Sequence, residues 1–64
     1  MTLYQFYKFL SGKGISCCYR KFNGIYDPIK QAVYAWSNIT LVIRLAKEHG
    51  FRAEMDTTSR VMIY

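Results

Sequence analysis

The chain has 64 residues, of which 52% are hydrophobic and 17% aromatic, and its formal net charge is +5. This length has room for one domain, residues 1–64, and the composition is typical of a globular rather than a disordered chain. No apolar stretch approaches the roughly 20 residues that a bilayer-spanning helix requires, which excludes a membrane-spanning class.

A helix is predicted at the start of the chain. Thr2 and Gln5 have the spacing of a capping box, in which each side chain accepts a hydrogen bond from the other residue's backbone amide. Apolar residues then recur at the spacing of one helical face; they are Leu3, Phe6, Tyr7 and Leu10. The segment SGKG, residues 11–14, follows them. Its glycines either end the helix or, together with the lysine, cradle a phosphate.

An internal repeat decides between these two roles. The first segment aligns with the segment that begins at residue 39 with a constant offset of 36 residues, so that Gly14 falls on Gly50. SGKG then takes the place of KEHG, at the end of a second apolar repeat. A phosphate loop would need an earlier glycine, a serine or threonine after the lysine, and a helix that follows the loop. We therefore predict that SGKG ends a helix.

Two strands are predicted between the helices. Residues 15–22, ISCCYRKF, are rich in β-branched and aromatic side chains, and turn signals run from Asn23-Gly24 to Asp27-Pro28. Residues 29–36 allow two interpretations. The run Val-Tyr-Ala-Trp favours a strand, whereas the helical spacing of the apolar positions, with Asp27-Pro28 before them, is typical of a helix start. The strand is the favoured interpretation.

A helix and a hairpin are predicted in the second half of the chain. Ser37 is expected to be the N-cap of the helix, and Gly50 is expected to end it. Residues 51–56 then alternate between apolar and charged side chains, residues 57–59 form a turn, and residues 60–64 alternate again.

These elements predict an α+β fold in the order α-β-β-α-β-β, with two helices packed on one face of an antiparallel sheet. The sequence of strand, capped helix, glycine and strand over residues 32–55 resembles SPOR domains and small phage inhibitors of bacterial RNA polymerase. That resemblance implies no role for any individual residue.

The sheet face opposite the helices is expected to carry the binding residues. Strand parity places arginines between aromatic side chains there, a mixture found both in base-stacking platforms and in protein–protein hot spots. The predicted partner-binding residues are Trp36, Tyr34, Arg20, Arg52, Arg60, Tyr64 and Lys30.

The chain offers little for catalysis or metal binding. His49 is the single histidine and is expected at a helix end, where it suits the helix dipole. Cys17 and Cys18 are neighbours, which disfavours a disulfide between them and does not fit zinc-ligand spacing. We therefore predict no enzyme, no catalytic residue, no metal site and no cofactor. Free thiols and the lack of signal-peptide features favour a soluble, unprocessed cytoplasmic chain.

The predicted function is that of a small non-enzymatic binding protein. It would dock through the basic-aromatic face onto a larger macromolecular machine and inhibit or modulate it, as phage or mobile-element inhibitors of nucleic-acid enzymes do. The expected partner is a protein that has an acidic surface or is associated with nucleic acid, and no membrane partner is expected. A sequence-tolerant single-stranded nucleic-acid-binding protein is the alternative function, and self-association is a further alternative for this face.

Overall fold

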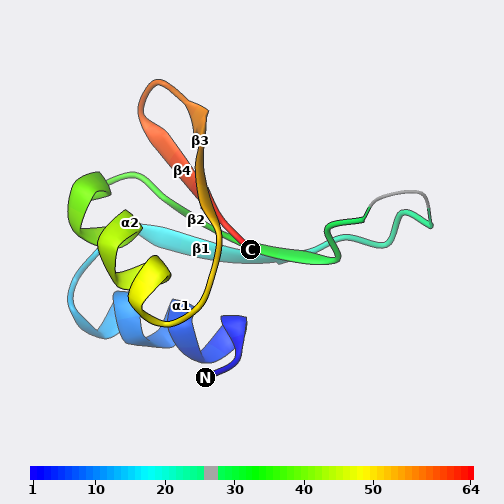
Figure 1. Ribbon diagram of the computed structural model, residues 1–64, viewed down its shortest axis with the longest axis horizontal. Coiled ribbons are helices and arrows are strands. Elements are labelled where there is room, and N and C mark those ends of the chain that lie inside the picture. Colours follow the sequence, from blue (N-terminus) through cyan, green and yellow to red (C-terminus); the bar gives the residue numbers. More distant parts are fainter. Residues whose placement is uncertain (26–27) are drawn as a thin grey trace.

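The computed structural model describes residues 1–25 and 28–64. Their elements follow the order α-β-β-α-β-β (Figure 1). The bounds are α1 Leu3–Gly12, β1 Cys17–Lys21, β2 Gln31–Ala35, α2 Ile39–Glu48, β3 Ala53–Thr57 and β4 Arg60–Ile63. The strands form a four-stranded sheet in the order β1-β2-β4-β3, and every neighbouring pair is antiparallel. This confirms the predicted α+β architecture, and within residues 29–36 the segment Gln31–Ala35 is a strand, as the favoured interpretation predicted.

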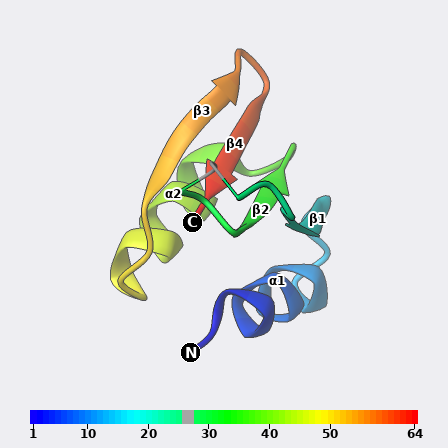
Figure 2. The ribbon, with the colours of Figure 1, turned by 90° about the vertical axis from the view of Figure 1, so that its right-hand side faces the viewer.

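Both helices pack against the same face of the sheet. α1 contacts β1 and β2, whereas α2 contacts β4 and β3 (Figure 2). The apolar stripes of the helices meet alternate residues of the two central strands, as amphipathic helices on a half-buried sheet must. The core consists of Leu3, Phe6, Leu10, Ile15, Val33, Ala35, Val42, Ala46, Val61 and Ile63. Neither helix of the described residues covers the other face of the sheet (Figure 2).

The two helices end in the same way. Gly14 has a φ of 77° and Gly50 a φ of 82°, both in the left-handed region that favours glycine. After the first helix the N–H of Ile15 donates to the Leu10 carbonyl at 3.2 Å, and after the second the N–H of Phe51 donates to the Ala46 carbonyl at 2.9 Å. These bonds satisfy carbonyls that a helix end leaves free. SGKG is therefore a helix stop, as predicted.

The structure extends the internal repeat to whole elements. With an offset of 36 residues, the bounds of α1 fall on those of α2, and the bounds of β1 fall on those of β3. Each half of the chain is thus an αββ unit, α1-β1-β2 in the first and α2-β3-β4 in the second. The two units differ in the connection between their strands, which is short between β3 and β4 and long between β1 and β2. Past the end of β1, the N–H of Phe22 still donates to the Lys30 carbonyl at 2.9 Å. Residues 22–25 and 28–30, which we call the arm, project away from both helices (Figure 1). Asp27, part of the predicted turn, lies outside the described residues.

The predicted N-caps have different outcomes. Thr2 and Gln5 form the expected capping box at 3.1 and 2.8 Å. Ser37 is not the cap of α2, because that position belongs to Asn38, which has a left-handed φ of 50° and no capping hydrogen bond from its side chain. The Ser37 hydroxyl instead accepts a hydrogen bond from the N–H of Ser16 at 3.1 Å. The prediction was wrong because this partner is distant in sequence and lies on the approach to β1.

Candidate binding face of the sheet

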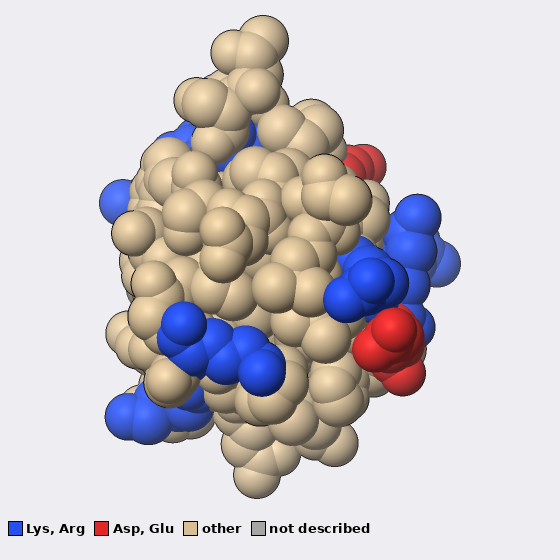
Figure 3. Space-filling view, turned by 90° about the vertical axis from the view of Figure 1, so that its left-hand side faces the viewer, with Lys and Arg blue, Asp and Glu red and all other residues tan. Residues whose placement is uncertain are grey.

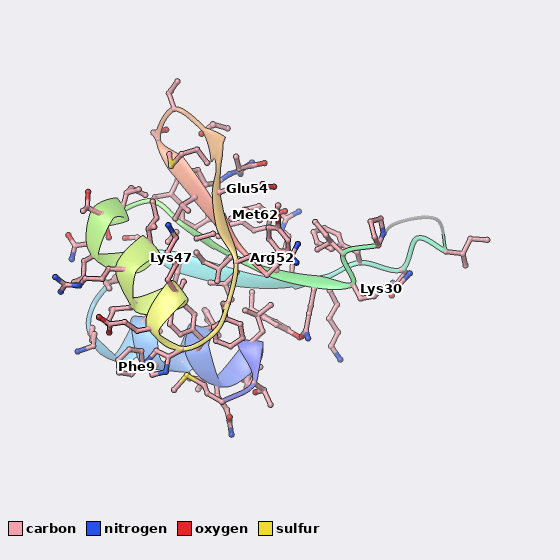
Figure 4. The ribbon with its side chains drawn as sticks, in the orientation of Figure 1. Phe9, Lys30, Lys47, Arg52, Glu54 and Met62 are labelled. Carbon is pink, nitrogen blue, oxygen red and sulfur yellow. The ribbon has the colours of Figure 1, made fainter. Side chains whose placement is uncertain are left out.

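The pairing register defines which side chains share the face without helices, here called the open face. Cys18 pairs with Tyr34, Tyr34 with Met62, and Met62 with Glu54, so these four residues form one row across the sheet. Figure 4 labels Met62 and Glu54, at one end of this row. Val33 and Val61, one position along, are fully buried under the helices. Because alternate residues of a strand point to opposite faces, the row of Tyr34 belongs to the open face.

Trp36 stands at one end of the open face. It follows the last residue of β2, and its N–H donates to the Ser16 carbonyl at 3.0 Å, which continues the β1–β2 pairing. Its side chain is 45% exposed, whereas Phe6 under the helices is 0% exposed. A helical segment would instead have placed Trp36 in the core.

Arg60 is held beside Trp36 on the open face. Its guanidinium forms an ion pair with Asp56 and lies 4.9 Å from the centroid of the Tyr34 ring. Its side chain is 36% exposed, and its Nε has no hydrogen-bond partner in the described structure. The cation–π contact and the ion pair fix this side chain. The Asp56 carboxylate also offsets its charge.

Tyr64 occupies the opposite end of the open face. It follows β4 as Trp36 follows β2, and because the two strands are antiparallel the aromatic residues lie at opposite ends. Tyr64 and Arg52 exchange backbone hydrogen bonds of 2.8 and 2.9 Å. Arg20 pairs with Ala32 on the neighbouring strands, so continuing the register gives the row Arg20, Ala32, Tyr64 and Arg52.

The two ends therefore differ in electrostatic character. At the Trp36 end, Arg60 is paired with an acid. At the Tyr64 end, neither Arg20 nor Arg52 has an ion pair within residues 1–25 and 28–64. Lys30, the remaining predicted site residue, lies at the base of the arm and donates from Nζ to the Gly24 carbonyl at 3.0 Å (Figure 4). Among the described residues, the arginines of the face that have no ion pair therefore lie at the Tyr64 end.

Basic residues also occur away from the open face. On the side of the molecule opposite the arm, several Lys and Arg side chains stand apart around a broad uncharged region, and acidic side chains lie close to some of them (Figure 3). On α2, Arg44 and Glu48 form an exposed ion pair of 3.9 Å. The open face differs in placing arginines beside the exposed Trp36 ring and the partly buried rings of Tyr34 and Tyr64.

The cysteines and the histidine do not meet. Cys18 lies on the open face, whereas the His49 ring packs at an angle against the rings of Phe6 and Phe9 on the helix side, with centroid distances of 5.8 and 5.6 Å. Cys17 is half-buried, and its Sγ donates to the Tyr7 carbonyl at 3.9 Å. Burial, together with the neighbouring Cys18, raises the pKa of the Cys17 thiol above its ordinary value. Within the described chain, no His, Cys, Asp and Glu side chains gather into a metal-binding group.

Sequence reasoning missed a tyrosine cluster at the β1 edge. The rings of Tyr4, Tyr7 and Tyr19 have centroid distances of 5.2 to 6.3 Å, and Tyr4 is 49% exposed. The Tyr19 hydroxyl donates to Oε1 of Gln31 at 2.5 Å. One signal was present, since Tyr4 and Tyr7 are three residues apart and therefore neighbours on a helix.

Comparison with known proteins gives no match to a family model, a curated protein or a solved structure. Among the helices of the described residues, none has the length and apolar character to cross a membrane.

Proposed function

We propose that this chain is a non-enzymatic binding protein that docks through its open face onto the acidic surface of a larger macromolecular assembly and modulates it. The observation that carries the proposal is the exposed Trp36, which is 45% exposed and lies in the row beside Tyr34 on a face with no helix over it. Tryptophan, tyrosine and arginine dominate the binding energy of protein–protein interfaces.

Preorganisation of the face supports the same proposal. Tyr34 is part of a central strand, and Arg60 is already fixed over its ring by Asp56. Side chains that are ordered before binding lose less conformational entropy when a partner arrives. The face therefore presents an anchor, Trp36, next to a fixed polar contact.

Arg20 and Arg52, which have no ion pair in the part of the chain that the structure describes, favour a second candidate function, binding of single-stranded nucleic acid. Arg20 lies on the edge strand β1 and Arg52 immediately precedes the edge strand β3, and together they flank Tyr64 at the end of the central strands. Nucleic-acid platforms combine such cations for phosphates with rings for bases. Several phosphate contacts would make affinity fall steeply with salt, whereas a hot-spot protein interface is less sensitive.

Affinity capture from a native lysate, with and without nuclease, tests the proposal. The tagged wild-type chain is compared with Trp36→Ala and with Tyr4→Ala, which removes an aromatic residue of similar exposure from the helix side. We expect a nuclease-resistant protein partner that Tyr4→Ala retains and Trp36→Ala loses. Equal capture by all three chains would contradict the proposal, and capture that nuclease abolishes would favour the nucleic-acid alternative.

A further inference from the structure

A groove of about 710 Å³ lies where the two αββ units meet, on the arm side of the molecule. The first unit contributes the start of α1 and the base of the arm, and the second unit contributes the connection from α2 to β3 together with Tyr64. Leu3, Ile29 and Phe51 give the groove apolar walls. Its volume lies within the range of about 300 to 1,000 Å³ that is typical of ligand-binding clefts.

The charges of the groove are all of one sign in the described structure. Lys30 and Arg52 are the charged side chains among the described residues that line it. Lys30 donates to the backbone carbonyl of Gly24 and has no ion pair with an acidic side chain of the described residues. Arg52 has no ion pair within the described chain. A groove with two cations and apolar walls complements a ligand that carries carboxylates next to apolar side chains.

The groove is continuous with the open face. Arg52 and Tyr64 line the groove and also form the row at the Tyr64 end of the face. A partner seated on Trp36 and extending along the central strands would therefore reach the groove at the other end.

We infer that the groove receives an acidic peptide segment of the partner protein. A carboxylate of that segment lies between Lys30 and Arg52, and an apolar side chain next to it packs against Phe51 and Ile29. This inference rests on the proposed function, because it names the chemistry of the partner at one end of the same interface. It adds a second contact that is separate from the Trp36 anchor.

The test is an NMR titration of the isotope-labelled chain with a short capped peptide of alternating glutamate and leucine. A peptide with glutamine in place of glutamate is the matched probe. We expect the acidic peptide to shift the amide signals of Lys30, Gly50 and Arg52, and the glutamine peptide to leave them unchanged. Arg52→Gln and Lys30→Gln should each weaken binding about two- to fivefold, the range that one exposed ion pair contributes. Lys47→Gln removes the same charge from α2, away from the groove, and should leave binding unchanged (Figure 4).

Three results would overturn the inference. The glutamine peptide could bind as well as the acidic one, or Lys47→Gln could weaken binding as much as Arg52→Gln. A short oligothymidylate could also shift the groove signals while the acidic peptide does not, which would assign the groove to phosphate. Each of these outcomes leaves Trp36-dependent capture untouched, so failure of the groove is distinguishable from failure of the proposed function.

Discussion

At the scale of single residues, the side chains of the open face differ in whether they already have a partner within the chain. Trp36 has solvent around much of its ring, whereas Arg60 is held by Asp56 and by the Tyr34 ring. Strand parity in the sequence was sufficient to place both residues on one face. The ion pair could not be predicted from parity, because an irregularity between Met55 and Thr57 shifts the register beside Arg60.

Trp36 and Phe6 should respond in opposite ways to truncation. Trp36→Ala should weaken partner binding by about 2 kcal/mol or more, as central aromatic anchors do. Phe6→Ala should instead lower the free energy of unfolding by about 3 to 5 kcal/mol, because Phe6 is fully buried in the core. Urea unfolding of both variants, next to a binding assay, measures the difference. A larger loss of stability for Trp36→Ala than for Phe6→Ala would contradict the placement.

Cys17 should make stability sensitive to alkaline pH. Burial and the neighbouring Cys18 raise the Cys17 pKa above its ordinary value, so the folded state binds the thiol proton more tightly than the unfolded state does. As pH rises into the alkaline range the unfolded thiol ionises first, and the free energy of unfolding falls. Cys17→Ala removes this contribution, so its stability should decline less than that of the wild type as pH rises from neutral through that range. The free energy of unfolding of both chains is measured by urea titration at several pH values. If it changes equally with pH in the two chains, Cys17 is not the source of the pH dependence.

At the scale of elements, local sequence signals predicted the helices well, but they did not predict the contacts that distant parts of the chain make. The capping box, the apolar spacing and the two stop glycines all lie within a few residues of the helix they define. The N-cap of α2 was mispredicted because Ser37 bonds to Ser16, 21 residues away. Met55 shows the same limit, since it pairs with Val61 on the helix side but is 47% exposed on an edge strand.

The stop glycines provide a test at this scale. A Cβ added at Gly14 or Gly50 would meet nothing within 4 Å, so substitution costs only the left-handed backbone. Gly14→Ala and Gly50→Ala should each lower stability by roughly 1 to 2 kcal/mol, and the asparagine variants should cost less because asparagine tolerates this conformation. Thermal unfolding followed by circular dichroism measures the order of stability of the wild type, the asparagine variants and the alanine variants. Alanine variants as stable as the wild type would rule out helix-stop roles for these glycines.

At the scale of the whole molecule, the repeat of 36 residues predicted the two αββ units, and a helix-free sheet face followed from packing both helices on one side. The groove could not be predicted, since its walls come from four separate segments whose meeting depends on the tertiary packing. The result is one surface with the exposed Trp36 at one end and, at the other, two arginines that have no ion pair among the described residues.

The fluorescence of Trp36 tests whether the open face is the binding surface. Because Trp36 is the single tryptophan, all indole emission reports from this face. Acrylamide quenching is measured on the free chain and on its complex with the captured partner, provided that the partner is tryptophan-free or selectively labelled. We predict red-shifted, readily quenched emission in the free chain and protected emission in the complex. Equal quenching in both states would place the partner elsewhere and contradict the account.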